Sequence, residues 1–101
     1  MTDVVFHPAA RAEYESALEW YQSRNARAAT RFEAEMERIL EWIGTSPEMF
    51  PKYDDESRFA VLRRYPYSVI YSIQPGQVYV IAVAHSSRSA GYWQGRGTPG
   101  S

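Results

Sequence analysis

The stretch that decides the fold is RFAVLRRYPYSVIYSIQPGQVYVIAVAH, residues 58–85. Pro66 and Pro75-Gly76 divide it into runs that are rich in β-branched and aromatic residues. These runs are 58–65, 67–74 and 77–85. Runs of this composition, separated by turn residues, are typical of consecutive strands. The stretch therefore predicts three antiparallel strands in the last half of the chain.

Two helices are predicted ahead of these strands. Apolar side chains recur at helical spacing after Pro8, which suits the first position of a helix, and again after Asn25, which suits an N-cap. The second helix should end near Gly44. A short apolar run at 4–6 predicts a first strand. The order is β-α-α-β-β-β, an α+β fold with a helical hairpin packed on a small, mainly antiparallel sheet.

Length and composition predict one folded domain. The chain has 101 residues, of which 45% are hydrophobic and 23% charged, as in ordinary globular proteins. We expect this domain to span residues 1–93 and the glycine-containing stretch 94–101 to be a flexible tail. The longest apolar run, 78–84, is too short to span a bilayer, and Asp3 stands where a signal peptide would be positive. A cytoplasmic location is therefore expected.

Few residues are available for a metal or cofactor site. The chain contains no cysteine and only two histidines, His7 and His85. It therefore has no thiolate cage and too few imidazoles for a metal centre without added carboxylates. No glycine-rich phosphate loop follows a predicted strand. We expect neither a metal nor a cofactor.

Charge is divided unevenly along the chain. All twelve acidic residues lie in residues 1–57, whereas residues 58–101 contain five arginines and no acid. Glu13, Glu15 and Glu19 fall outside the apolar stripe of the first helix. The arginines can form a positive surface for a partner, or the acidic half can neutralise them within the fold. Both readings stay open at this point.

Register places several polar groups at one end of the predicted sheet. If Gln74 faces Gln77 across the second turn, then His85 falls opposite Pro66. That position lies beside the end of the preceding strand. Arg88 follows three residues after His85, and a backward fold of the chain would bring an aromatic side chain to the same edge. The predicted cluster consists of Arg63, Arg64, His85, Arg88 and Tyr92.

Three segments, in this order and spacing, resemble the RelE/ParE toxin superfamily over residues 4–93. They are Phe6-His7-Pro8-Ala9-Ala10, then Leu62-Arg63-Arg64-Tyr65-Pro66-Tyr67-Ser68-Val69-Ile70-Tyr71, then Val83-Ala84-His85 with Arg88 and Tyr92-Trp93. The resemblance implies a bacterial plasmid-stabilisation toxin of a type II toxin–antitoxin pair. It also implies a cognate antitoxin that neutralises the toxin in a heteromeric complex.

The superfamily offers two mechanisms. RelE-like members cut messenger RNA on the ribosome without a metal, and this reading would make the arginine, histidine and tyrosine cluster catalytic. ParE-like members bind DNA gyrase without catalysis. Lys52 is the only lysine and the sequence pI is about 6.1, which disfavours docking to ribosomal RNA.

We therefore favour the ParE-like reading, in which the chain is a binding protein and not an enzyme. The partner-binding residues would be Arg64, Arg88, Tyr92 and Trp93. An inactive homologue that only binds an antitoxin is a further alternative.

Overall fold

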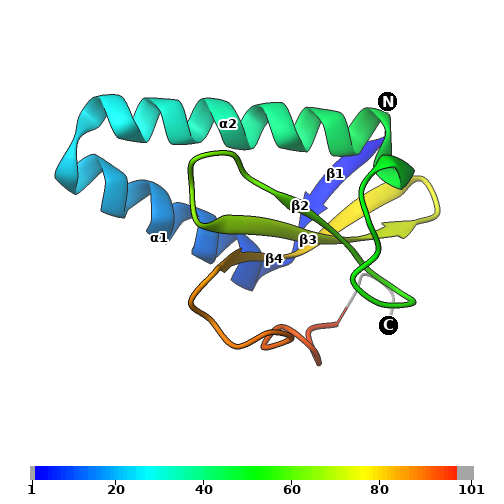
Figure 1. Cartoon of the computed structure of the whole chain (residues 1–101). Helices are drawn as coiled ribbons and strands as arrows, with labels where there is room; N and C mark the ends of the chain where they lie inside the picture. Colours follow the sequence, from blue (N-terminus) through cyan, green and yellow to red (C-terminus); the bar gives the residue numbers. More distant parts are fainter. Residues whose placement is uncertain (1, 98–101) are drawn as a thin grey trace.

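The computed structural model describes residues 2–97 and has the predicted element order (Figure 1). The elements are β1 Asp3–Phe6, α1 Pro8–Arg24, α2 Ala26–Thr45, a short 3₁₀ helix Pro47–Met49, β2 Arg58–Val61, β3 Tyr67–Gln74 and β4 Gln77–His85. The sheet order is β1-β4-β3-β2, with β1 parallel to β4 and the other neighbours antiparallel. The predicted α+β class and strand-helix order are confirmed.

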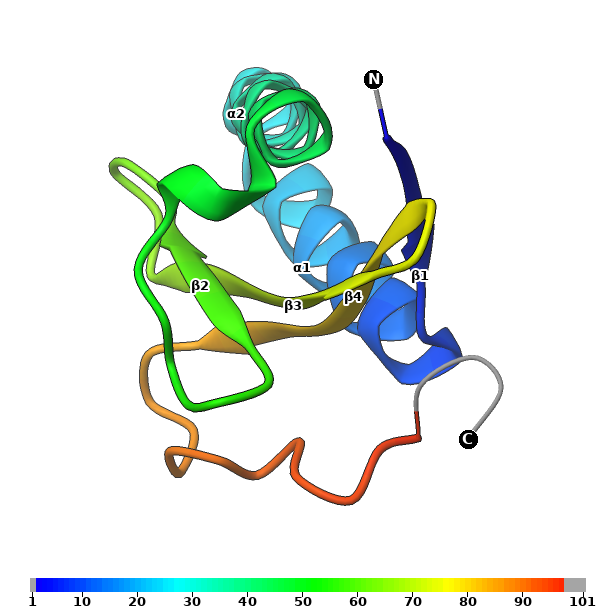
Figure 2. The ribbon, with the colours of Figure 1, turned by 90° about the vertical axis from the view of Figure 1, so that its right-hand side faces the viewer.

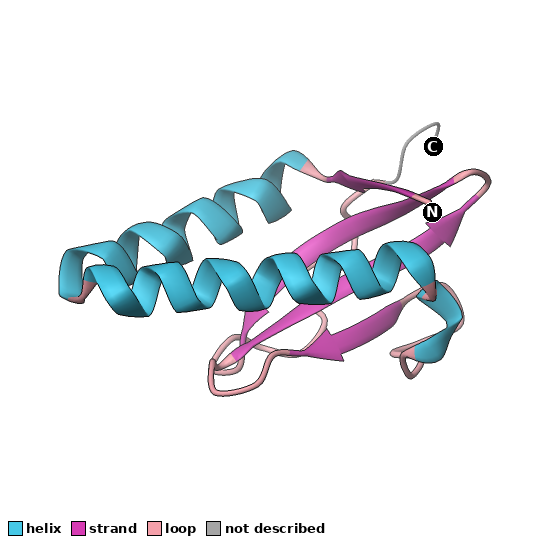
Figure 3. Cartoon of the chain, turned by 90° about the horizontal axis from the view of Figure 1, so that it is seen from above, coloured by secondary structure: helices cyan, strands magenta, loops and turns pink. Residues whose placement is uncertain are grey.

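Local capping explains where the two helices begin. The His7 side chain accepts a hydrogen bond from the Ala9 amide at 3.0 Å, just ahead of Pro8. The Asn25 carboxamide oxygen accepts from the amides of Arg27 and Ala28 at 2.9 and 3.3 Å. These bonds satisfy helix N-terminal donors that have no partner within the helix. Asn25 is the predicted N-cap, and the helices form a hairpin side by side over the strands (Figure 3).

The first predicted strand of the C-terminal half is shorter than expected. We predicted 58–65, but β2 ends at Val61. The chain then turns through Arg64, whose φ is +67°, a value that no extended strand allows. The turn points the ring of Tyr65 toward α1 and α2, where it lies 5.4 Å from Tyr21 and 5.3 Å from Phe32. Packing of this aromatic ring replaces continued strand pairing.

The register of the β3–β4 hairpin is as predicted at the turn and different at the open end. Gln74 faces Gln77, but a bulge pairs Ile70 with Ala82 and Tyr71 with Val80, which leaves one extra residue in β4. The bulge moves His85 by one position, so that it pairs with Tyr67 and not with Pro66. Sequence spacing assumed an unbroken ladder, and this assumption was wrong.

Both faces of the sheet are covered. The cluster facing the helices is built on Phe32, Met36, Ile43, Val69 and Val80. On the opposite face, aromatic residues of the loop before β2 and of the C-terminal segment cover Ile70, Ile81 and their neighbours. Figure 2 shows the segment after β4 crossing the face that the helices leave free. Within residues 2–97, no helix is long and apolar enough to cross a membrane.

The expected tail boundary at residue 93 is an untested prediction. Residues 94–97 are described, and Arg96 forms an ion pair with Glu13 at 2.9 Å. The remaining part of the expected tail, 98–101, lies outside the described residues.

We predict that Asn25→Ala lowers the free energy of unfolding by about 1 kcal/mol, because the first amides of α2 lose their acceptor. Asn25→Ser keeps a capping oxygen and should stay close to the wild type. Urea unfolding monitored by circular dichroism measures both variants. Equal losses in the two variants would contradict the capping role.

Candidate functional site

A groove of about 620 Å³ lies between α1 and the open end of the β3–β4 hairpin. Its walls include the aromatic residues Trp20 and Tyr21 of α1 and Tyr67 of β3. The predicted residues His85, Arg88 and Tyr92 all line it. The structure therefore brings these three predicted residues together.

Arg63 and Arg64 lie in the turn beyond this groove and do not line it. The Arg63 backbone amide donates to the Glu35 carboxylate at 2.8 Å, which ties the turn to α2. Arg64 is exposed at the turn. The predicted five-residue cluster is thus divided into a groove trio and an arginine pair in the turn.

The His85 ring is held in one tautomer. Its Nδ1 accepts from the Ser87 backbone amide at 3.0 Å and lies 2.8 Å from the Ser87 hydroxyl. A backbone amide can only donate, so Nδ1 carries a lone pair and the neutral ring carries its proton on Nε2. The ring packs edge-on against Tyr67, with centroids 5.0 Å apart. In this state His85, which lines the groove, has a donor at Nε2, and its Nδ1 is not a free base.

Arg88 stacks on a neighbouring ring and remains accessible. Its guanidinium carbon lies 3.8 Å from the centroid of Tyr92, and Nη1 lies 3.9 Å from the Glu13 carboxylate. The Arg88 side chain is still 54% exposed. A stacked guanidinium has a fixed orientation and keeps donors for another acceptor. Arg88 is therefore suited to bind an anionic or carbonyl group of a partner.

Glu13 is the site residue that sequence reasoning missed. One carboxylate oxygen accepts from the Val83 amide at 3.0 Å, and the other from the Tyr92 hydroxyl at 2.7 Å. Arg96 donates to both oxygens, at 3.0 and 2.9 Å. The sequence placed Glu13 off the apolar stripe of the helix, but its side chain is only 16% exposed.

One signal in the sequence could have located Glu13. It lies three residues after Ala10 and four before Ala17, and both alanines are buried. Residues at these spacings share one face of a helix. A carboxylate between two buried alanines requires a partner, and the sequence supplied that partner more than eighty residues away.

The network changes the acidity of its members in opposite directions. Burial of Glu13 acts to raise the pKa of its carboxyl, but hydrogen bonds from Arg96, Tyr92 and Val83 outweigh burial and lower it. Burial, and then the bond to Glu13, raise the pKa of Tyr92 to about 12. Tyr92 therefore remains a protonated donor at neutral pH, with its proton directed to Glu13.

Trp93 lies in the packed cluster on the second face of the sheet and is only 6% exposed. Its ring contacts Tyr53 and Tyr92, with centroid distances of 5.0 and 5.2 Å. The predicted role of Trp93 in partner binding is untested. The structure gives it a packing role in the isolated chain.

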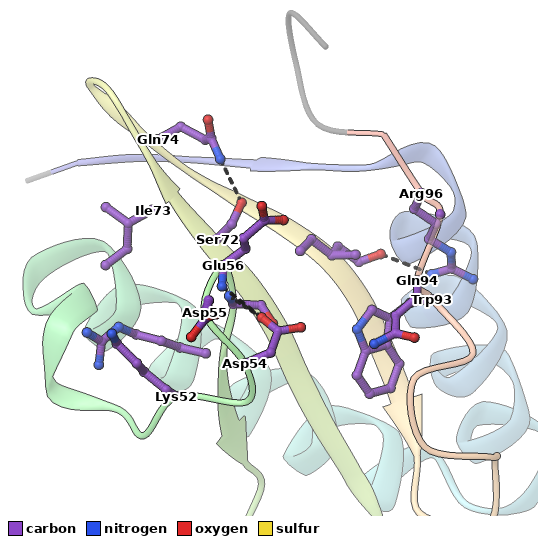
Figure 4. Close-up of a pocket in the computed structure, with 14 residues that line it drawn as sticks. Lys52, Asp54, Asp55, Glu56, Ser72, Ile73, Gln74, Trp93, Gln94 and Arg96 are labelled. Atoms are coloured by element: carbon purple, nitrogen blue, oxygen red, sulfur yellow. Dashed lines mark hydrogen bonds between the residues drawn. The ribbon is translucent and has the colours of Figure 1, made fainter.

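A second cavity, of about 700 Å³, opens on the face away from the helices (Figure 4). The loop that carries Asp54, Asp55 and Glu56 borders it on one side and the segment Trp93–Arg96 on the other. Asp54 holds its own loop by accepting from Glu56 and Ser57 at 2.8–2.9 Å. Hydrogen bonds from the Glu56 backbone and Ser57 lower the pKa of Asp54. The Asp54 carboxylate therefore stabilises its own loop.

These contacts indicate which kinds of ligand the chain could bind, a metal ion or a peptide. Among the described residues, no group of His, Asp and Glu side chains has an arrangement that could hold a metal ion. In the groove, the Tyr92 hydroxyl, the Glu13 carboxylate and His85 Nδ1 are all engaged in internal hydrogen bonds. The remaining features are apolar walls and the donors of Arg88 and His85, which suit a peptide with apolar and acidic side chains.

Comparisons with known proteins agree with this fold. Residues 4–90 match the sequence model of a family described as the ParE toxin of type II toxin–antitoxin systems, parDE. A chain of the chromosomal ParDE TA system from P. aeruginosa superposes with a TM-score of 0.71 at 11% identity. The match covers 84% of this chain and 96% of that one. Comparison with curated protein sequences gives no match.

We predict that Trp93→Ala lowers the free energy of unfolding by about 3–5 kcal/mol, because it removes a buried ring from the second cluster. Trp93→Phe should lose less, since it keeps an aromatic contact with Tyr53. Trp42, which is 43% exposed on α2, is the control, and Trp42→Ala should change stability little. Urea midpoints compare the three variants, and an effect at Trp93 no larger than at Trp42 would contradict the packing role.

Proposed function

Because the chain belongs to the family of ParE toxins of type II toxin–antitoxin systems, we propose that it inhibits DNA gyrase by binding to it. We further propose that a cognate antitoxin neutralises it in a heteromeric complex. Gyrase and the antitoxin act in the cytoplasm, so a cytoplasmic location is part of the proposal.

The Arg88–Tyr92 stack is the observation that carries the gyrase proposal. Arginine and tyrosine are over-represented among residues that dominate protein interfaces. Here the guanidinium lies 3.8 Å from the ring centroid and is 54% exposed. Stacking fixes the cation before a partner arrives, which reduces the entropy lost on binding.

The state of the groove argues against messenger RNA cleavage. Removal of the 2′-hydroxyl proton needs a free base, and protonation of the leaving oxygen needs a free acid. His85 Nδ1 accepts from the Ser87 amide and is not a free base, and the Tyr92 hydroxyl proton is directed to Glu13, so the His85 Nε2 proton is the one donor that this pair leaves available. Arg63 and Arg64 lie outside the groove, where they do not face a phosphate bound in it. These contacts support binding over catalysis.

We predict that Arg88→Ala weakens gyrase inhibition about thirtyfold, which corresponds to a hot-spot loss of about 2 kcal/mol. The measurement is the concentration of purified chain that halves supercoiling by gyrase. Arg31→Ala removes an equal charge from an exposed position on α2 and should behave as the wild type. The double variant Arg64→Ala, His85→Ala should also retain most of the inhibition.

A parallel assay on ribosomes programmed with messenger RNA separates the alternatives. The gyrase proposal would be overturned in favour of an endonuclease if the wild type cleaves the message and leaves supercoiling unaffected. In that case the double variant Arg64→Ala, His85→Ala should abolish the cleavage. No response in either assay would favour an inactive homologue that only binds antitoxin.

For the antitoxin we propose the groove itself as the contact. Trp20 is 51% exposed beside apolar walls, and Arg88 and His85 supply donors at the same groove. This combination fits an antitoxin segment that carries apolar anchors next to acidic side chains.

We predict that Trp20→Ala weakens antitoxin affinity by about 2 kcal/mol, because an exposed aromatic anchor is lost from the groove. Trp42 offers a matched control on α2. Each tryptophan lies under an arginine, Arg24 at 4.6 Å for Trp20 and Arg38 at 5.5 Å for Trp42. Calorimetry with the product of the adjacent antitoxin reading frame measures both variants. Equal losses would contradict the groove as the contact.

A further inference from the structure

β4 continues past the end of β1, and side chains occupy the edge that β1 leaves. The pairing of β1 with β4 ends at Phe6 and Val80, although β4 runs on to His85. Beyond this point, the Ile81 carbonyl accepts from Arg96 at 3.0 Å and the Val83 amide donates to Glu13 at 3.0 Å. Two side chains thus satisfy backbone groups that a strand would otherwise pair.

The same two side chains bind each other in a fork-to-fork geometry. Arg96 Nη1 and Nη2 lie 3.0 and 2.9 Å from the two oxygens of Glu13. The Arg96 and Glu13 side chains are only 18% and 16% exposed. A bidentate, half-buried pair is stronger and more directional than an exposed ion pair. The C-terminal segment is therefore fastened to α1 at one carboxylate.

Glu13 also determines where the Arg88 guanidinium lies. The Tyr92 hydroxyl donates to Glu13 at 2.7 Å, which fixes the ring on which Arg88 stacks. Since Arg96 neutralises the Glu13 carboxylate, Arg88 at 3.9 Å is oriented without being fully paired. Glu13 thus orients the ring of Tyr92, and the ring of Tyr92 orients the guanidinium of Arg88.

We propose that Glu13 is a positioning residue that latches the segment 86–97 over the open edge of β4 and holds Arg88 in its binding geometry. The segment crosses the sheet away from the helices and returns to the start of α1 (Figure 2). The positioning role rests on the proposed gyrase contact at Arg88, whereas the latch itself rests only on contacts within the chain.

Limited trypsin digestion of the full chain tests the latch. Glu13→Gln keeps the size of the side chain and an acceptor for Val83, but it loses the charge that holds Arg96. Cleavage after Arg96 and after Arg88, followed by mass spectrometry, should be at least about tenfold faster than in the wild type, since loss of a charged hydrogen bond makes the open segment more populated. Glu15→Gln makes the same charge change at an exposed position of α1 and should digest as the wild type. Cleavage of Glu13→Gln at the wild-type rate overturns the latch.

A second variant approaches the latch from the segment. Arg96→Gln leaves α1 unchanged and should accelerate cleavage after Arg88 as Glu13→Gln does. Circular dichroism should find both variants folded. Faster cleavage after Arg88 in Glu13→Gln alone would overturn the assignment of Arg96 as the partner in the latch.

The pH dependence gives a signature that a packing role would not produce. Three side chains of the segment face Glu13, namely those of Arg88, Tyr92 and Arg96. From β4, the Val83 amide donates to Glu13, and His85 lines the same groove. Folding lowers the pKa of Glu13 from its ordinary value of 4.5. The charged carboxylate therefore stabilises the fold fully at pH values above 4.5, and this stabilisation is lost as the pH falls through the lowered pKa. The stability difference between wild type and Glu13→Gln should therefore shrink between pH 7 and pH 3. A constant difference would overturn the charged latch.

Gyrase inhibition separates the latch from the proposed function. Glu13→Gln should weaken inhibition as Arg88→Ala does. If Glu13→Gln frees the segment while even the wild type leaves gyrase unaffected, the latch holds and the gyrase proposal fails. If the wild type inhibits gyrase and the freed segment inhibits equally well, the positioning role is overturned.

Discussion

Antiparallel pairing of β3 with β4 is the interaction on which the rest of the structure depends. The ladder runs from Gln74 and Gln77 at the turn to Tyr67 and His85 at the open end. Every residue of β4 between its two end residues is buried, and β1 adds in parallel along the other edge. The helical hairpin covers one face, and aromatic residues of two loop segments cover the other. The β3–β4 hairpin thus organises both hydrophobic clusters.

The bulge in β4 links this scaffold to the groove. The extra residue lies where β1 ends, so the backbone groups beyond it have no neighbouring strand among residues 2–97. Glu13 and Arg96 satisfy them and in doing so bring α1 and the C-terminal segment to the same place. A bulge that changes register is a common way to direct side chains beside a functional site. Here it pairs His85 with Tyr67, one position further from the arginine turn than Pro66, which the sequence spacing placed opposite His85.

Charge segregation along the chain is resolved in part within the fold. Arg96 pairs with Glu13, and the amide of Arg63 is bound to Glu35. Arg58 donates to backbone carbonyls of Glu48 and Phe50. Arg88 retains an exposed guanidinium. Neutralisation within the fold therefore applies to Arg96, whereas a positive surface for a partner stays a prediction.

The sequence by itself determined the order of the elements, the cap at Asn25 and the Gln74–Gln77 turn, because periodicity, capping and turn chemistry act over a few neighbouring residues. It also indicated that His85, Arg88 and Tyr92 gather at one end of the sheet. Only the tertiary structure decided the bulge, the inward position of Glu13 and the burial of Trp93. The physical reason is that each depends on partners distant in sequence: the Glu13–Arg96 pair closes across 83 residues, and no local pattern encodes that distance.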